Sequence, residues 1–356
     1  MRETRPGAVI VLAAGEGTRM KSATPKVLHT IGGRSLVGHV VAASELLDPG
    51  HLVVVVGHGR DAVSAHLADI STLARPVVQE PQDGTGHAVR LALEAFPDVE
   101  GTVVVVAGDT PLLTAGTLAS LTSQHVEDGN AATVLTAILD DPTGYGRVLR
   151  DDDSKVTAIV EHKDADEAQR AVREVNSGMY AFDAALLRQA INALTRDNAQ
   201  GEEYLTDVLG ILGRAGHRLG AVIAQDRHEI LGVNDRVQLA AAGAYLRDRI
   251  AEAWMRAGVA IIDPATTWIG VDVTLEADVT LLPNVQLHGR TSIATGARIG
   301  PDTTLHDTVV GPRASVVKSH VVGAEVGEAA TVGPFSYLRP GTRLGARGKI
   351  GAYVET

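Results

Sequence analysis

The hydrophobic positions in the first two thirds of the chain fall into short apolar runs separated by amphipathic stretches. The runs occupy residues 8–14, 52–57, 76–80, 102–108 and 133–139. Uninterrupted apolar runs are typical of strands that are buried on both faces, and helices between them allow the strands to lie parallel. Two further runs, 146–150 and 156–161, flank an acidic turn at 151–153 and predict an antiparallel hairpin. The pattern therefore predicts an α/β domain with a mostly parallel but mixed sheet.

The periodicity changes after a stretch at 239–257, where Leu246, Ile250 and Trp254 recur at helical spacing. From there an aliphatic residue occupies nearly every sixth position. These positions are Ile269, Leu275, Leu281, Leu287, Ile293, Ile299 and Leu305, then Val310, Val316 and Val322, then Val326, Val332, Leu338, Leu344 and Ile350. Such hexads predict a parallel β-helix, in which three hexads make one triangular coil and the aliphatic side chains stack inside. Hexad β-helices are left-handed, against the usual crossover hand.

The two patterns divide the chain into three predicted parts. They are an α/β domain at residues 1–237, a linker helix at 238–260 and an incomplete left-handed β-helix at 261–356. The last hexad closes just before Thr356 without a polar cap, and an uncapped solenoid end exposes its stack. We therefore expect the chain to be a C-terminally truncated fragment.

Composition narrows the class of protein. The sequence has no cysteine, which excludes disulfides, a thiol nucleophile and thiolate metal sites. No apolar run approaches the roughly 20 residues of a membrane span, and the run at 8–14 is too short for a signal peptide. The net charge of −11 argues against a nucleic-acid surface. We expect a cytoplasmic protein without membrane or nucleic-acid partners, in which an anionic ligand would need locally gathered cations or a metal ion.

Glycine-rich or acidic turns at 13–20, 79–88 and 107–111 follow three of the predicted strands. Ligands of open α/β sheets bind at this edge, beyond the carboxyl ends of the strands. In the first turn, Gly15, Gly17 and Thr18 let backbone N–H groups approach phosphate oxygens, and Arg19 and Lys26 add positive charge. Neither a P-loop nor the third glycine of a dinucleotide fingerprint is present. The turn suits a nucleoside triphosphate.

Several segments, taken in order, resemble a known family. They are LAAGEGTRM (12–20) with Pro25-Lys26, Gln79 with GTGHA (84–88), GDTP (108–111), GYGR (144–147), IVEHKD (159–164), NSG (176–178), YLTD (204–207) and GVNDR (232–236). The first resembles the signature of sugar-1-phosphate nucleotidyltransferases. The full order, followed by a helix and hexads, resembles the bacterial bifunctional N-acetylglucosamine-1-phosphate uridyltransferases and glucosamine-1-phosphate acetyltransferases over the whole chain. The resemblance implies a Rossmann-like nucleotidyltransferase domain followed by part of an acetyltransferase β-helix.

The resemblance implies transfer of UMP from UTP to N-acetylglucosamine 1-phosphate, giving UDP-N-acetylglucosamine, a cell-wall precursor, and pyrophosphate. Arg19, Lys26 and Asp109 would be catalytic, and Asp109 and Asn234 would hold Mg²⁺ through hard oxygen atoms. The implied nucleotide-binding residues are Leu12, Ala13, Ala14, Gly15, Gly17, Thr18, Gln79, Gly84 and Thr85. The implied sugar-binding residues are Gly108, Gly144, Glu161, Asn176, Tyr204, Thr206 and Asn234.

Individual residues refine this expectation. Gln79 offers a donor and an acceptor that match O4 and N3–H of uracil. His87 is expected to be a structural histidine rather than a general base, because the attacking phosphate is already ionised. Asp83 stands where leucine is commoner in the family, and Glu203 where a second aromatic residue often precedes Tyr204. Asp83 adds negative charge near the base site and is expected to weaken UTP binding slightly.

The β-helix matches the acetyltransferase half only in part. Arg339 aligns with the arginine that contacts the amino-sugar phosphate in that half of the family. The remaining implied residues of that site, including the acetyl-CoA contacts, fall beyond Thr356. We therefore expect acetyl transfer to be lost in this fragment and present in the intact protein. The flat faces of a triangular β-helix also predict a homotrimer of the full-length protein, whereas the sequence leaves open whether these incomplete coils suffice.

Two alternatives remain open at this point. One is a nucleotidyltransferase for glucose or mannose 1-phosphate with another base, against which Ala13, Ala14 and Gln79 argue. The other is a regulatory subunit without activity, which predicts loss of the phosphate and metal residues. Arg19, Lys26, Asp109 and Asn234 are all present.

Overall fold

The computed structural model describes residues 5–151, 155–198 and 200–356. The acidic turn of the predicted hairpin lies partly outside these ranges. The chain forms two compact units, of which the first comprises residues 1–29 and 35–238 and the second comprises 30–34 and 239–356. The contiguous boundaries predicted from the sequence do not include the excursion at 30–34.

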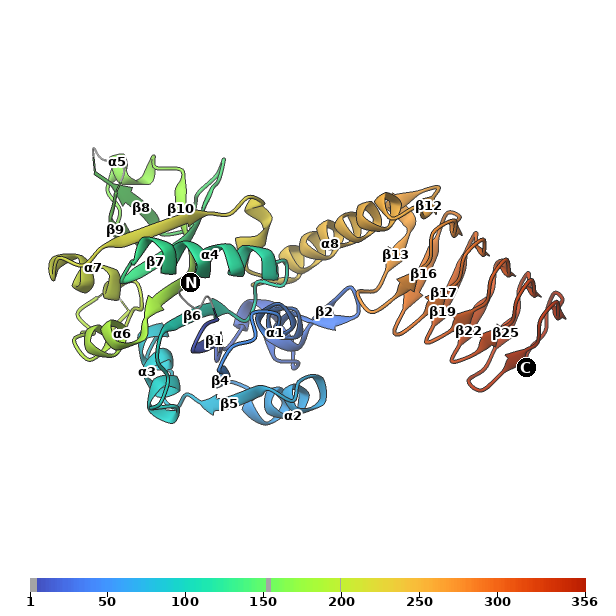
Figure 1. Cartoon of the computed structure of the whole chain (residues 1–356), viewed down its shortest axis with the longest axis horizontal. Helices are drawn as coiled ribbons and strands as arrows, with labels where there is room; N and C mark the ends of the chain where they lie inside the picture. Colours follow the sequence, from blue (N-terminus) through green and yellow to red (C-terminus); the bar gives the residue numbers. More distant parts are fainter. Residues whose placement is uncertain (1–4, 152–154, 199) are drawn as a thin grey trace. The chain divides into compact units, whose positions relative to one another are not determined.

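A mixed sheet forms the centre of the first unit (Figure 1). Its strands are β1 (Ala8–Ala13), β4 (His51–Val56), β5 (Ala74–Val78), β6 (Thr102–Ala107), β7 (Ala132–Ile138), β10 (Glu174–Asp183), β11 (Leu219–Ile223) and the hairpin β8 (Arg147–Arg150) and β9 (Val156–Val160). The main order is β11-β7-β10-β6-β1-β4-β5. All seven predicted runs form strands, with ends shifted by at most two residues. The prediction of a mostly parallel, mixed sheet is confirmed.

Strand β10 was not among the predicted runs, although it lies inside the sheet between β7 and β6. β10 runs antiparallel to both β6 and β7, and the antiparallel β8 also pairs with it. The register of β10 against β7 shifts between Asn176 and Tyr180, where the Asn-Ser-Gly segment forms a bulge. A bulge inserts turn-like residues into a strand and interrupts its apolar pattern, which is why the pattern did not indicate a strand.

Helices cover both faces of the sheet because neighbouring residues of each strand point to opposite faces. Val9 and Val11 of β1 pack into one core, whereas Ala8 and Ile10 pack into the other. The first core is covered by α1 (Leu36–Glu45), α2 (Arg60–Ile70) and α4 (Ala115–Asp128). The second is covered by α3 (Thr85–Ala95), α6 (Ala184–Ile191) and α7 (Asp207–Arg214). Short turns complete the unit: η1 (Thr18–Met20), η2 (Lys26–Leu28), η3 (Arg227–Ile230) and α5 (Glu167–Arg170).

The second unit contains most of the linker helix α8 (Arg236–Arg256), the turn η4 (Pro264–Thr266) and three parallel sheets. Strand β2 (Thr30–Ile31) pairs with β3 (Arg34–Ser35), and the turn between them joins this unit through Val271 N, which donates to Gly32 O at 2.9 Å. Arg34 Nη2 lies 2.6 Å from Asp272 Oδ1. These bonds bring a segment of the early chain to the second unit.

The three sheets form the β-helix seen as stacked coils in Figure 1. One contains β12 (Ala260–Ile261), β15 (Thr280–Leu281), β18 (Arg298–Ile299), β21 (Ser315–Val316), β24 (Thr331–Val332) and β27 (Lys349–Ile350). The second contains β13 (Trp268–Ile269), β16 (Val285–His288), β19 (Thr303–His306), β22 (His320–Val322) and β25 (Tyr337–Leu338). The third contains β14 (Thr274–Leu275), β17 (Ser292–Ile293), β20 (Val309–Val310), β23 (Glu325–Val326) and β26 (Arg343–Leu344).

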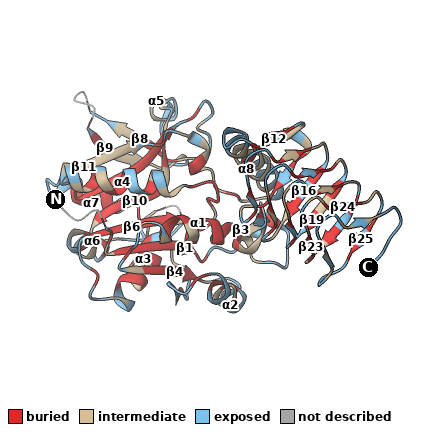
Figure 2. Cartoon of the chain, turned by 45° about the vertical axis from the view of Figure 1, so that its right-hand side comes forward, coloured by how far each residue is buried: buried red, intermediate tan, exposed pale blue. Residues whose placement is uncertain are grey.

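The stacking confirms the left-handed parallel β-helix that the hexads predict. Ile269 pairs with Leu287 and Leu287 with Leu305, so that three hexads make one coil. The aliphatic positions form a continuous buried core, visible as the red interior of the coils in Figure 2. One position was wrong: Val321, not Val322, stacks on Leu305 and is fully buried. The spacing is five residues from Val316 to Val321 and again five from Val321 to Val326. The prediction instead kept six residues up to Val322 and placed both missing residues after it.

Among the helices of the described ranges, none combines the length and hydrophobicity that crossing a bilayer requires.

Candidate functional site

The glycine-rich turn follows β1 directly and folds into η1. Gly17 has a φ of +63°, in the left-handed region. A side chain at this position would also place its Cβ 2.5 Å from Lys26 Cβ. Gly17 is therefore required by its backbone conformation and by the close approach of the segment that carries Lys26.

Lys26, Asp109 and Asn234 meet at one point, although they come from three distant parts of the chain. Lys26 Nζ lies 2.5 Å from Asp109 Oδ2 and 3.2 Å from Asn234 Oδ1. The side chains of Lys26 and Asp109 are 13 % and 20 % exposed, so the ion pair is largely shielded but reachable. Two hard oxygen atoms thus converge on a single cationic position.

Backbone hydrogen bonds hold this arrangement at the carboxyl edge of the sheet. Gly108 N donates to Leu12 O at 2.8 Å, which joins the turn after β6 to the end of β1. Val233 N donates to Asp109 O at 2.9 Å and brings Asn234 beside the carboxylate. Burial raises the pKa of the Tyr145 phenol, and the negative charge of the nearby Asp109 raises this pKa further.

The other residues of the first turn surround this edge without joining the cluster. Ala13 and Ala14 are buried, and Leu12 is half-buried. Gly15, Thr18 and Arg19 are exposed, and no ion pair of Arg19 is recorded among the described residues. The structure therefore brings Lys26, Asp109 and Asn234 together and leaves Arg19 on the accessible face of η1.

A cavity of about 390 Å³ opens beside the end of β1. Seven of the predicted residues line it: Leu12, Thr85, Gly144, Glu161, Asn176, Tyr204 and Thr206. The first two were expected to bind the nucleotide and the other five the sugar. Sequence reasoning did not assign further lining residues, which include His162, Lys163, Tyr180 and Glu202. His162 and Lys163 directly follow Glu161 in the IVEHKD motif, and this position could have indicated them from the sequence.

Glu161 and Asn176 differ in how their polar atoms are engaged. Asn176 Oδ1 accepts hydrogen bonds from Gly178 N at 3.0 Å and Tyr180 Oη at 2.9 Å, which leaves its Nδ2 as a donor for a ligand. Burial raises the pKa of Glu161, and the neighbouring Asp164 and Asp207 raise it further. A carboxylate that is buried near other acids gains from ligand groups that donate hydrogen bonds to it.

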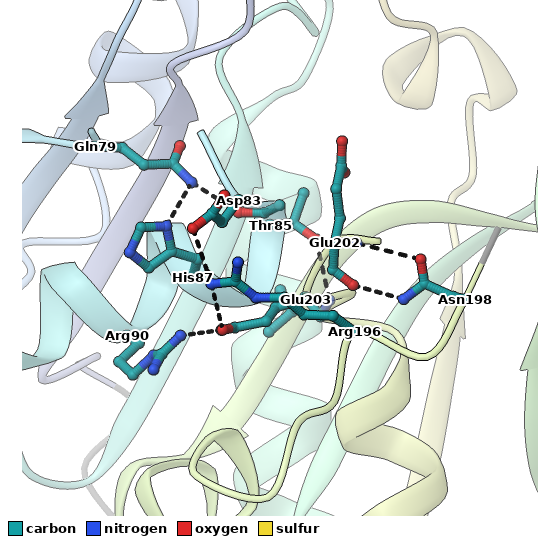
Figure 3. Close-up of polar contacts among 11 residues, drawn as sticks. Gln79, Asp83, Thr85, His87, Arg90, Arg196, Asn198, Glu202 and Glu203 are labelled. Carbon is teal, nitrogen blue, oxygen red and sulfur yellow. Dashed lines mark hydrogen bonds and ion pairs between the residues drawn. The ribbon is translucent and has the colours of Figure 1, made fainter. Parts of the chain in front are cut away.

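Gln79 lies just past β5 and is 5 % exposed. Its Nε2 donates to Gly84 O at 2.8 Å and lies 3.5 Å from His87 Nδ1 (Figure 3). The amide nitrogen is thus engaged within the protein, and Oε1 is the Gln79 atom suited to a ligand. The sequence suggested that both the donor and the acceptor of this amide would contact the base, whereas only the oxygen is suited to it here. His87 lies beside the Gln79 amide and helps to orient it.

Asp83 and Glu203, the two departures from the family pattern, are joined through Arg196. Arg196 Nη2 lies 2.8 Å from Asp83 Oδ2 and 3.4 Å from Glu203 Oε1, and Arg90 pairs with the same Glu203 carboxylate (Figure 3). The negative charge of Asp83 is therefore paired with Arg196, a partner that the expected slight weakening of UTP binding did not take into account. Sequence reasoning missed both arginines, because no motif marks them.

Arg339, the residue predicted for the acetyltransferase half, follows β25 in the second unit. It is exposed, and its guanidinium pairs with Glu355. No cluster of three or more His, Cys, Asp or Glu side chains that could hold a metal ion occurs within the described ranges.

Comparison with known proteins identifies the family. Residues 9–177 match the MobA-like NTP transferase domain. The bifunctional protein GlmU of Streptomyces coelicolor is 60 % identical over 357 aligned residues, which cover 100 % of this chain and 74 % of that protein. The chain belongs to the GlmU family. GlmU of Pseudarthrobacter chlorophenolicus is 58 % identical over 99 % of the chain and 72 % of its own length. GlmU of Corynebacterium efficiens is 57 % identical over 98 % and 73 %.

Membership of the GlmU family confirms the resemblance read from the sequence motifs. The matched NTP transferase domain contains the glycine-rich turn, Asp109 and Glu161, and it ends just after Asn176. The chain is therefore a nucleotidyltransferase, and its substrates are a nucleotide and a sugar phosphate. It spans about three quarters of the length of its GlmU relatives.

Proposed function

We propose that the first unit transfers UMP from UTP to N-acetylglucosamine 1-phosphate. An oxygen of the sugar phosphate attacks the α-phosphorus of UTP, a new P–O bond forms, and the bond to the β-phosphate breaks. The bonding electrons leave with pyrophosphate, and UDP-N-acetylglucosamine remains. The observation that carries this proposal is the convergence of Lys26, Asp109 and Asn234 at the sheet edge, next to a cavity lined by the predicted sugar residues.

Charge is the main obstacle to this reaction, because both substrates are polyanions. Two unit charges about 4 Å apart repel by on the order of 4 kcal/mol at an effective dielectric constant of about 20. Lys26 and the exposed Arg19 supply fixed positive charge at the turn. Backbone N–H groups around Gly15 and Gly17 add donors for phosphate oxygens. Positioning and charge neutralisation would carry the catalysis, without a protein nucleophile.

A magnesium ion fits the same residues. Asp109 and Asn234 present a carboxylate oxygen and an amide oxygen to one point. The cationic Lys26 ammonium contacts both of these oxygen atoms. Mg²⁺ prefers oxygen ligands and is commonly bound by one or two protein side chains together with substrate phosphates. Bound there, it would neutralise negative charge on the phosphates. Release of Lys26 from Asp109 would then free the ammonium to contact the nucleotide.

The side-chain atoms that are not hydrogen-bonded within the protein indicate how the base and the sugar would be recognised. Gln79 Oε1 would accept the N3–H of uracil, with the backbone of Gly84 and Thr85 beside it. Glu161 would accept hydrogen bonds from sugar hydroxyl groups, and Asn176 Nδ2 would donate one. Tyr204 and Thr206, on the segment that leads into α7, would complete the sugar pocket.

The assay that tests this proposal measures pyrophosphate release with matched substrate pairs. UTP with N-acetylglucosamine 1-phosphate should give the highest kcat/KM, well above UTP with glucosamine 1-phosphate or glucose 1-phosphate. Greater activity with dTTP or GTP would overturn the uridyl assignment. Absence of turnover with every pair would favour a non-catalytic role instead.

For the second unit we propose a share in the acetyltransferase function of bifunctional GlmU proteins and in homotrimer formation. Arg339 would contact the phosphate of the amino sugar, with acetyl-CoA as co-substrate in the intact enzyme. Three flat parallel sheets support packing in threes, because each presents a face of regular outward side chains. Light scattering at several concentrations measures the mass; a monomer at all concentrations would exclude the trimer.

A further inference from the structure

The segment that carries Gln79 and Thr85 is joined to the segment that carries Tyr204 and Thr206 by backbone bonds. Glu203 N donates to Asp83 O at 2.8 Å, and Gly86 N donates to Glu203 O at 2.8 Å. Leu205 N donates to Thr85 Oγ1 at 3.0 Å. The residues proposed for the base and those proposed for the sugar therefore share one hydrogen-bonded ladder.

Gly84 lets the two segments lie this close. Its φ is +105°, and an added Cβ would lie 2.5 Å from Glu203 O. A backbone oxygen cannot move aside as a flexible side-chain end can. The glycine is thus needed for the contact with the second segment as well as for its own conformation.

Four charged side chains fasten the ladder; we call Asp83, Arg90, Arg196 and Glu203 the clasp. The Glu203 side chain is only 9 % exposed, and its two oxygen atoms face different arginines: Oε2 pairs with Arg90 and Oε1 lies 3.4 Å from Arg196. Arg196 also lies 2.8 Å from Asp83 Oδ2 (Figure 3). A buried carboxylate depends on such partners, because removing one leaves its charge uncompensated.

Hydrogen bonds with Asn198 also fix the conformation of the segment 200–206, which carries Tyr204 and Thr206. Asn198 Nδ2 donates to Glu202 O at 2.6 Å, and Asn198 Oδ1 accepts from Glu202 N at 3.3 Å. Glu202 and Tyr204 both line the 390 Å³ cavity, on either side of Glu203 in the sequence. Any displacement of Glu203 would therefore move two cavity residues together.

We propose that Arg196 and Glu203 are positioning residues that couple binding of the uridine nucleotide to binding of the sugar phosphate. A base held by Gln79 and Thr85 fixes the segment at 79–86, and the clasp transmits that order to residues 202–206. The inference rests on the proposed uridyltransferase function. None of the four clasp residues is proposed to contact either substrate.

The first test uses the full chain and Arg196→Met, which removes the guanidinium but keeps an unbranched apolar stem. The Arg196 side chain is 50 % exposed, so the fold should be retained. The KM values for UTP and for N-acetylglucosamine 1-phosphate should both rise 3- to 10-fold, while kcat changes less than 2-fold. Arg218→Met is the matched control: it removes a 63 % exposed, ion-paired arginine outside the clasp and should change neither KM.

The second test reads the coupling without turnover, by hydrogen exchange with UTP alone. In the wild type, UTP should slow exchange at the amides of Glu203 and Leu205, which bond to the base-side segment. This protection should be lost in Arg196→Met and reduced in Asp83→Asn. An unchanged KM for the sugar phosphate together with wild-type protection in both variants would overturn the coupling. If the wild type binds UTP but makes no UDP-N-acetylglucosamine, the proposed function fails, and the exchange experiment still decides the clasp.

Discussion

Lys26 Nζ lies 2.5 Å from Asp109 Oδ2, although 83 residues separate the two in the sequence. Asn234 Oδ1 accepts from the same ammonium at 3.2 Å. The lysine therefore lies against the oxygen atoms that suit a divalent ion. This relationship makes Asp109 the residue on which both the charge balance and the metal proposal depend.

Asp109→Ala should reduce pyrophosphate release at least about 100-fold, because it removes a charged group at the reacting phosphates. Circular dichroism should stay close to that of the wild type, since Asn234 Oδ1 remains as a partner for the Lys26 ammonium. Asp98→Ala, at a 72 % exposed acid, is the matched control and should keep full activity. Turnover retained in Asp109→Ala would remove this residue from the metal site.

Lys26→Met should bind Mn²⁺ several-fold more tightly than the wild type in the absence of nucleotide. The physical reason is that a fixed ammonium next to Asp109 and Asn234 repels a second cation. Electron paramagnetic resonance of free Mn²⁺ measures this affinity without an activity readout. Equal or weaker binding in the variant would show that the ion does not use these oxygen atoms.

Glu161 predicts a pH dependence of sugar binding. Burial, with Asp164 and Asp207 nearby, raises its pKa above the ordinary value of 4.5, so the carboxylate is lost earlier than usual as the pH falls. The KM for the sugar phosphate should be about tenfold higher in Glu161→Gln than in the wild type near pH 8, because hydrogen bonds to a charged acceptor are lost. The ratio of the two KM values should approach one as the pH drops through the raised pKa of Glu161. A ratio that is constant with pH would contradict this role.

His125 predicts a loss of stability in acid. Burial lowers the pKa of its imidazole to about 4 from 6.5, although Asp183 acts in the opposite direction. The unfolded chain therefore takes up this proton first, and the free energy of unfolding falls as the pH drops from about 6.5 towards 4. Linkage gives about 2 kcal/mol lost between pH 7 and pH 5 from this group.

The measurement is chemical unfolding at both pH values in the wild type and His125→Gln. The variant should lose about 2 kcal/mol less than the wild type over this interval, whatever its stability at pH 7. His217→Gln, at an exposed histidine, provides the comparison for a change of residue type alone. Equal losses in the wild type and His125→Gln would show that His125 does not titrate on unfolding.

Leu287 tests the stacked core of the β-helix. It is fully buried between Ile269 and Leu305, and Leu287→Ala should lower the free energy of unfolding by about 2–5 kcal/mol. Gln286→Ala, at the exposed neighbour, should have almost no effect. Both tryptophans, Trp254 and Trp268, belong to the second unit, so their fluorescence reports its unfolding. Similar unfolding curves for the two variants would contradict the proposed stack.

The repeats and strands could be read from the sequence because their signals are local. A side chain six residues further along takes the inward position on the next face of the coil, so Leu281, Leu287 and Ile293 mark the β-helix without any knowledge of distant contacts. The same holds for the apolar runs that become β1, β4 and β6. Val322 was chosen because it keeps the spacing of six after Val316, whereas the structure buries Val321 and shortens the spacing there to five, which only packing decides.

The motifs also determined which residue types the site would hold, since phosphate and metal chemistry limits the choice. The tertiary structure alone decided how they meet: Lys26 against Asp109 and Asn234, and Arg196 between Asp83 and Glu203. Such pairs join residues up to 208 positions apart. Their contacts depend on how the strands order in the sheet and how the connecting segments return to its edge, and no local pattern encodes that distance.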